Sequence, residues 1–276
     1  MTPPLDPATT RATPASAGAP LPAERREPLA ASPSRAILAS QPILLLGGFL
    51  IGAEAYGPMV ERLEQLSGQR VVLLSVTRLE WLLTIAPLGW ARLLDRVAVA
   101  AGELAGSSAS GRITLIGHSS GGILLHLFLA DGPFEGRRYR GRQLADTLIT
   151  LGSPHTALKA TAMRARVARE LPGAFFSRDP EFPVRYGAVA GAIDLDPSAG
   201  QASATARRLA PTAYRNSSGD ANDRGDGLVP LSSALLEGAE PVVLEGVAHG
   251  GAFGPRWYGS GDVVERWWAA LSGGLA

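Results

Sequence analysis

The feature that most constrains the fold is a serine flanked by glycines between two apolar segments. Residues 112–116 (R-I-T-L-I) have the composition of a buried strand, and residues 121–130 that of an apolar helix. The sequence G-H-S-S-G-G at 117–122 joins them and contains a G-x-S-x-G motif. A strand that turns sharply into a helix needs small residues on both sides of the turn. The pattern therefore predicts that Ser119 stands exposed at the carboxyl end of a strand.

A glycine-rich turn of this kind has other uses in proteins. A phosphate-binding P-loop contains a lysine that this segment lacks, and a dinucleotide-binding loop has a G-x-G-x-x-G spacing that it fails to match. A purely structural turn between a strand and a helix stays open as the alternative to a serine nucleophile.

The remaining apolar segments alternate between strand-like and helix-like patterns. Strands that are apolar throughout indicate a sheet buried on both faces, which is typical of parallel strands joined by helices. We therefore predict an α/β fold with a mostly parallel central sheet and helices on both faces. The expected strands are 43–46, 70–76, 112–116, 147–151, 188–193 and 242–244, and the expected helices are 56–66, 90–104, 121–130 and 263–271.

Two segments depart from this alternation. Residues 1–36 are rich in Pro, Ala, Ser and Thr without apolar periodicity, so we predict a disordered tail followed by one domain over 37–276. Residues from about 156 to 215 are the least regular part of that domain and contain several prolines. We predict a small irregular cap over the site there, with a helix at 163–171 and apolar residues at 174–176 that could line a pocket.

Charge and composition exclude several classes of protein. The chain of 276 residues has 26 basic and 25 acidic side chains, whereas a dedicated nucleic-acid-binding protein needs a basic excess. The absence of cysteine excludes disulfides, thiolate zinc sites and a cysteine nucleophile. The four histidines form no H-x-x-x-H pair, and we expect neither a metal site nor a cofactor.

The uncharged stretch 36–53 has about the minimum length of a membrane span. Gln41, Pro42, Gly47 and Gly48 interrupt it, so a buried strand that runs into a glycine turn is the favoured interpretation. The first 35 residues lack the apolar segment of a secretory signal. We therefore expect a soluble protein, with the cytoplasm as the favoured location.

The segment I-G-H-S-S-G-G at 116–122 resembles the nucleophile elbow of lipases and esterases of the α/β-hydrolase superfamily. Four more segments follow the same order as in that family, and together the resemblance covers roughly residues 40–272. They are similar to the oxyanion turn, the turn after the next strand, the acid loop and the histidine loop: L-G-G-F at 46–49, L-G-S-P-H at 151–155, G-D-G-L-V-P at 225–230 and V-A-H-G at 247–250.

The resemblance implies a catalytic triad in the order serine, acid, histidine. Ser119 would be the nucleophile, His249 the base and Asp226 the acid. His249 is the only histidine far enough downstream of the serine. The acid is less constrained, and four other aspartates stay open as alternatives: Asp194, Asp196, Asp220 and Asp223.

The resemblance also implies an oxyanion hole made of two backbone amides. Ser120 would supply one amide and Phe49 the other, with Leu50 as the alternate. The family's usual histidine at the start of this turn is replaced by Gly47, so the support of the turn is expected to differ. Leu50 and His155 are expected to contact the substrate.

Two histidines are expected to have structural roles. His118, next to the nucleophile, should pack or form a hydrogen bond beneath the turn. His126 should be a core histidine on the apolar helix.

The function that the resemblance implies is hydrolysis of a carboxylic ester through an acyl-enzyme, with a small-molecule or lipid ester as substrate. A non-catalytic binding protein of the same fold, and an acyltransferase or amidase with the same triad, stay open as alternatives. The basic run at 137–142 (R-R-Y-R-G-R) could contact an anionic membrane surface, although a solvated loop is favoured. The sequence gives no expectation of oligomeric state.

Overall fold

The computed structural model describes residues 40–156, 166–167 and 181–273, all of which belong to one compact unit. The predicted tail at 1–36 and the apolar residues 174–176 lie outside the described residues. So does the predicted helix at 163–171, apart from 166 and 167.

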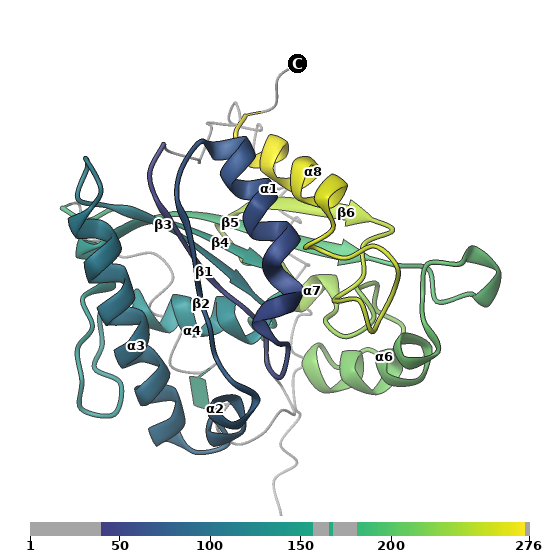
Figure 1. The fold of residues 1–276 in the computed structure, drawn as a ribbon. Helices are drawn as coiled ribbons and strands as arrows, with labels where there is room; N and C mark the ends of the chain where they lie inside the picture. Colours follow the sequence, from purple (N-terminus) through teal and green to yellow (C-terminus); the bar gives the residue numbers. More distant parts are fainter. Residues whose placement is uncertain (1–39, 157–165, 168–180, 274–276) are drawn as a thin grey trace, which may run out of the picture. The chain divides into compact units, whose positions relative to one another are not determined.

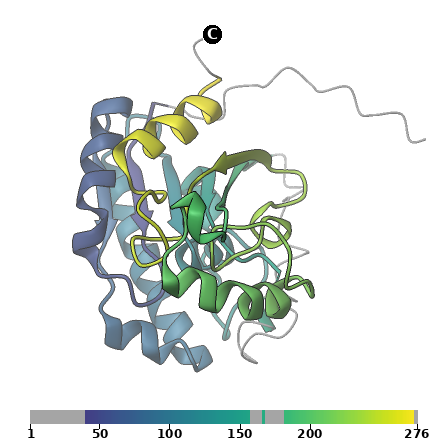
Figure 2. The ribbon, with the colours of Figure 1, turned by 90° about the vertical axis from the view of Figure 1, so that its right-hand side faces the viewer.

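The described unit contains a six-stranded sheet in which every neighbouring pair of strands is parallel. The predicted fold class, a mostly parallel sheet with helices on both faces, is therefore confirmed. Because the strands are parallel, all their carboxyl ends meet at one edge, and the loops that follow β5 and β6 gather there (Figure 2). The strand order is β2-β1-β3-β4-β5-β6, with β1 Ile43–Leu46, β2 Val71–Leu74, β3 Ile113–His118, β4 Ala145–Leu151, β5 Arg185–Ala192 and β6 Glu240–Glu245.

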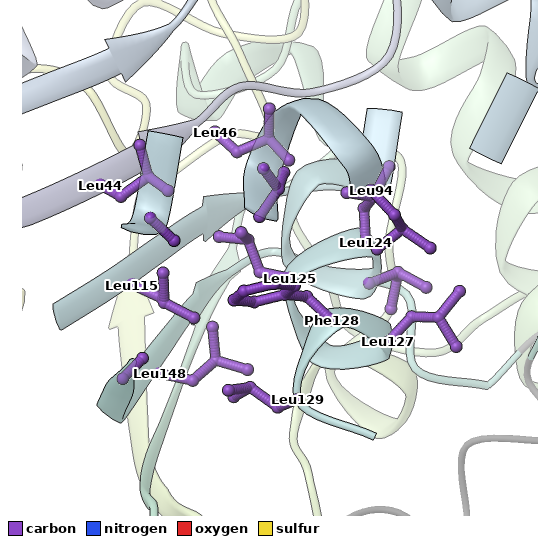
Figure 3. Close-up of a cluster of buried hydrophobic side chains, with 14 of the residues drawn as sticks. Leu44, Leu46, Leu94, Leu115, Leu124, Leu125, Leu127, Phe128, Leu129 and Leu148 are labelled. Atoms are coloured by element: carbon purple, nitrogen blue, oxygen red, sulfur yellow. The ribbon is translucent and has the colours of Figure 1, made fainter. Parts of the chain in front are cut away.

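Successive residues of each central strand are buried against opposite layers of helices. Leu44 and Leu46 of β1 pack with α3 (Pro87–Gly106) and α4 (Ser120–Phe128), as Figure 3 shows in close-up. Ile43 and Leu45 belong to the core on the other face, with α1 (Gly57–Ser67) and α8 (Gly261–Leu271) (Figure 1). A fully buried leucine side chain stabilises the fold by about 1.5–3 kcal/mol.

Several predicted boundaries shift for local reasons. The helix expected from residue 90 begins at Pro87, and α1 begins one residue before Pro58, because proline is favoured in the first turn of a helix. Three α-helices were not predicted: α2 (Arg78–Leu83), α6 (Ala204–Ser217) and the short α7 (Leu231–Ala234). Of these, α6 contains Pro211, which normally breaks a helix. The shortest helices are α7 (Leu231–Ala234) and the 3-10 helices η1 (Ala53–Tyr56), η2 (Gly141–Gln143) and η3 (Pro197–Ala199).

The range predicted for the cap contains a strand of the sheet. β5 lies between β4 and β6, and its last seven residues are buried. A cap formed by the rest of 156–215 stays a prediction. Among the described residues, no helix combines the length and the apolar character needed to cross a membrane.

Candidate active site

Ser119 occupies the turn between β3 and α4 in a strained backbone conformation. Its φ is 53° and its ψ is −123°, a region that residues with a side chain rarely adopt and that costs about 1–3 kcal/mol. The neighbouring glycines make the turn possible. A Cβ atom at Gly117 would lie 2.3 Å from the Cα of Gly122, and one at Gly121 would lie 2.4 Å from the carbonyl oxygen of Leu46. The glycines of the motif are therefore required by the close approach of β3, α4 and β1.

Three residues far apart in the sequence form one hydrogen-bonded chain at this turn. The Nε2 atom of His249 lies 2.9 Å from the Oγ of Ser119, and its Nδ1 lies 2.8 Å from Oδ2 of Asp226. Asp226 and His249 are almost completely buried, while Ser119 retains 7% of its surface. The structure thus brings together the three residues that the sequence analysis selected.

The carboxylate of Asp226 is fully satisfied by donors. Its Oδ1 accepts hydrogen bonds from the amides of Leu228 (3.0 Å) and Val229 (2.7 Å), and its Oδ2 accepts from Tyr258 (2.9 Å) and His249. Since a carboxylate only accepts, Nδ1 of His249 carries the proton and Nε2 is left to accept from the serine hydroxyl. Burial, and after it the charge of Asp226, raises the pKa of Tyr258, so this hydroxyl stays a donor.

The four alternative aspartates have other partners. Asp196 caps η3 by accepting from the amide of Ser198, and Asp194 accepts from the amide of Asp196. The side chain of Asp220 accepts from the amide of Asn222 and that of Asp223 from the hydroxyl of Ser232. His249 is hydrogen-bonded to Asp226 and not to any of these four.

Gly152 leaves room for the carboxylate of Asp226. A Cβ atom at position 152 would lie 2.7 Å from Oδ2 of Asp226.

The turn after β1 lies directly against the nucleophile. A Cβ atom at Gly48 would lie 2.9 Å from the Cβ of Ser119. The amide of Gly48 donates to the hydroxyl of Tyr56 at 2.7 Å and is therefore engaged. The amide of Phe49, which is predicted for the oxyanion hole, comes next in the turn. The other predicted amide belongs to Ser120, the first residue of α4. An amide at that position of a helix has no acceptor within the helix. Phe49 is exposed, as is Leu50, which has a φ of 61°.

Tyr56 explains why this turn can start with glycine instead of histidine. A Cβ atom at Gly47 would lie 2.5 Å from the Cε2 of Tyr56, so the tyrosine ring fills the space beside that residue. The sequence analysis placed Tyr56 only at the start of a helix. No spacing in the sequence points to its contact with the turn, because that contact depends on how η1 folds back.

The remaining histidines are buried. His118, expected beneath the turn, forms hydrogen bonds with Tyr56 and with the carbonyl of His249. His155 contacts the hydroxyl of Thr150 at 3.2 Å, and burial lowers its pKa to about 4. Its ring also lies beside that of His126, and its role in substrate binding stays a prediction. His126 is buried in α4, as expected for a core histidine.

The basic run 137–142 is largely engaged with the protein itself. Arg137 forms an ion pair with Asp95 of α3, and Arg142, which is buried, pairs with Asp131 at 3.1 Å. Arg138 donates to the carbonyl of Asp131. These contacts favour a structural loop, and membrane contact by this run stays a prediction.

Comparison with known proteins gives only distant likenesses. No protein-family model matches the chain, and no curated protein matches its sequence. Among solved structures, it is similar to the ferulic acid complex of Est1E from Butyrivibrio proteoclasticus (15% identity, 84% of this chain and 86% of that one, TM-score 0.46).

Two further likenesses are of the same order. Esterase 2 from Thermogutta terrifontis, phosphoramylated by tabun, is 15% identical over 91% of this chain and 89% of that one, with a TM-score of 0.42. A candidate hydrolase of the alpha/beta superfamily from Xanthomonas campestris pv. campestris is 14% identical over 84% and 96%, with a TM-score of 0.43. We draw no functional conclusion from similarity at this level.

Proposed function

We propose that the protein is a serine hydrolase that cleaves a carboxylic ester through an acyl-enzyme. The observation that carries this proposal is the hydrogen-bonded chain from Asp226 through His249 to Ser119, which ends at the strained turn between β3 and α4. A serine hydroxyl is a weak nucleophile at neutral pH and needs an adjacent base. The hydrogen bond of 2.9 Å from Ser119 to His249 supports His249 in that role.

The proposed reaction begins when Nε2 of His249 takes the proton of Ser119 as its Oγ attacks the ester carbonyl. Asp226 holds the imidazole in the required tautomer and stabilises the imidazolium that forms. The amides of Phe49 and Ser120 donate to the oxyanion of the tetrahedral intermediate. The intermediate expels the alcohol, which takes the proton from His249. In the second half of the reaction His249 takes a proton from water, which attacks the acyl-enzyme. The acid is then released, and the proton on His249 returns to Ser119.

An apolar acyl group is the substrate feature that the surroundings favour. Phe49 and Leu50 expose apolar surface beside the proposed oxyanion hole, and the ring of Phe49 packs edge-on against Trp81 of α2. Leu79, Leu82 and Leu83 of α2 are also exposed. We therefore propose an ester with an apolar acyl chain, which includes lipid esters.

The test is a series of p-nitrophenyl esters of increasing acyl length, with the wild type and Ser119→Ala compared. We expect the wild type to hydrolyse the series, and Ser119→Ala to lose about 10³-fold or more in kcat, because the attacking atom is gone. Ser120→Ala is the matched control, since it keeps the backbone amide and should retain most of the activity. Hydrolysis by Ser119→Ala at the wild-type rate would contradict the proposal. Transfer of the acyl group to an added amine or alcohol in preference to water would assign an acyltransferase instead.

A further inference from the structure

One buried side chain connects the turn over the nucleophile with the loop of the proposed base. His118 is the last residue of β3 and has no exposed surface. Its Nδ1 lies 2.8 Å from the hydroxyl oxygen of Tyr56, and its Nε2 lies 2.8 Å from the carbonyl oxygen of His249. Neither contact is needed for the turn itself, since the residue at this place in a G-x-S-x-G motif is not fixed.

Each hydrogen bond in this connection has only one possible direction. The carbonyl of His249 can only accept, so Nε2 of His118 carries the proton. Its Nδ1 must then accept from the hydroxyl of Tyr56, whose oxygen accepts in turn from the amide of Gly48 at 2.7 Å. The connection therefore runs from Gly48 through Tyr56 and His118 to the backbone of His249, with every donor and acceptor matched.

Burial keeps this pattern of protons in place. Burial lowers the pKa of His118 well below its usual value, and the neighbouring His249 lowers it further, so the ring stays neutral. Burial also raises the pKa of Tyr56, so its hydroxyl keeps its proton. Neither group titrates in the range in which an esterase works.

The connection is also tightly packed. The centroid of the His118 ring lies 4.9 Å from that of His249, 5.9 Å from that of Tyr56 and 5.6 Å from those of Trp257 and Tyr258. A Cβ atom at Gly48 would lie 3.2 Å from Nδ1 of His118. A shift of His118 would therefore move both the turn and the histidine loop.

We propose that His118 is a positioning residue that, through Tyr56, holds the oxyanion turn at a fixed distance from the backbone of the catalytic histidine. It does not contact the substrate. This inference rests on the proposed function, because it assigns a role for the reaction at Ser119. Its physical basis is that a displacement of about 1 Å in a catalytic group can lower the rate by about 10²-fold.

The test compares Tyr56→Phe, His118→Gln and the double variant. Tyr56→Phe keeps the ring beside Gly47 and removes only the hydroxyl. We expect each single variant to lower kcat by about 10- to 100-fold, with KM changed by less than about threefold, because the substrate contacts remain. Both changes break the same hydrogen bond, so the double variant should lose no more than the more damaging single variant. Independent roles would instead multiply the losses to about 10²- to 10⁴-fold.

Tyr139→Phe is the matched control. The hydroxyl of Tyr139 also forms hydrogen bonds within the protein, to the carbonyl of Ala91 and to the carboxylate of Asp95, each at 3.2 Å. Both partners belong to α3, and not to the turn after β1 or to the loop of His249. It should keep the wild-type kcat, and a loss equal to that of Tyr56→Phe would overturn the positioning role.

A ¹⁵N NMR spectrum of the histidine side chains separates this inference from the proposed function. We expect His118 to be the Nε2–H tautomer near pH 7, with an Nδ1 signal that shifts in Tyr56→Phe. An Nδ1–H tautomer, or multiplied losses in an active enzyme, would contradict the positioning role alone. The expected tautomer in a wild-type protein without any esterase activity would contradict the proposed function and, with it, any role in positioning.

Discussion

Two pairs of buried histidines lie in this protein, and they differ in what surrounds them. The rings of His118 and His249 are 4.9 Å apart, and those of His126 and His155 are 5.8 Å apart. All four side chains are buried. Burial by itself therefore does not distinguish a reactive histidine from a structural one.

The difference lies in the charged and polar groups beside each pair. His249 is bonded to the carboxylate of Asp226 on one side and to a serine hydroxyl on the other. His126 instead has its pKa lowered by burial first, and then by the charges of His155 and Arg142. A carboxylate favours the imidazolium that forms in catalysis, whereas a guanidinium opposes it. We infer that the carboxylate of Asp226, and not the depth of burial, would prepare His249 for the proposed proton transfer.

Removal of the carboxylate beside His249 should have the largest effect on activity. We expect Asp226→Asn to lower kcat by about 10³- to 10⁴-fold, because an amide NH₂ can donate to Nδ1 and favour the wrong tautomer of His249. Steady-state hydrolysis of a p-nitrophenyl ester measures the loss. Asp223→Asn is the matched control on the same loop, since Asp223 bonds to Ser232, and it should retain nearly full activity. Equal kcat values for Asp226→Asn and Asp223→Asn would contradict the idea that the carboxylate of Asp226 distinguishes His249 from the histidines of the other pair.

A smaller effect is expected in the pH dependence of stability at the second pair. Burial lowers the pKa of His155 from 6.5 to about 4, so between these values the unfolded chain binds a proton that the folded chain does not. The free energy of unfolding should therefore fall as the pH falls through this window, by about 2 kcal/mol between pH 7 and pH 5 from His155 alone. Urea unfolding at the two pH values measures it.

The variant His155→Gln isolates the contribution of His155 to this loss of stability. It lacks the titrating group, so its loss of stability between pH 7 and pH 5 should be smaller than that of the wild type by the same amount, about 2 kcal/mol. An identical loss in both proteins would mean that the pKa of His155 is the same in the folded and the unfolded chain, which would contradict the prediction.

The sheet and the three proposed catalytic residues could be predicted from the sequence because each carries a local signal. The strands of the sheet are short apolar runs, and Ser119 stands between glycines that the tight turn requires. His249 was selected by its place downstream of the serine, and Asp226 by its resemblance to an acid loop. In each case the signal lies in neighbouring residues or in chain order.

The supporting residues could not be predicted because their signals depend on the tertiary fold. Tyr258 reaches Asp226 from 32 positions away. His118 is expected beneath the turn from its place beside Ser119, but its partner, the backbone of His249, lies 131 positions away and is not indicated by the sequence. A single tyrosine or histidine has no periodicity that would indicate such a partner. The helix α6 was missed for a related reason: its buried side, Ala206, Ala210 and Tyr214, is narrow and adjoins Pro211.

The central claim is that Ser119 is a nucleophile activated by His249. The most direct measurement is reaction with a fluorophosphonate probe, followed by mass spectrometry of the digested protein, for the wild type and for His249→Gln. The account predicts an adduct on Ser119 in the wild type and a greatly slowed reaction in the variant, because the base that takes the serine proton is missing. An adduct on another serine, or labelling of Ser119 at the same rate without His249, would contradict it.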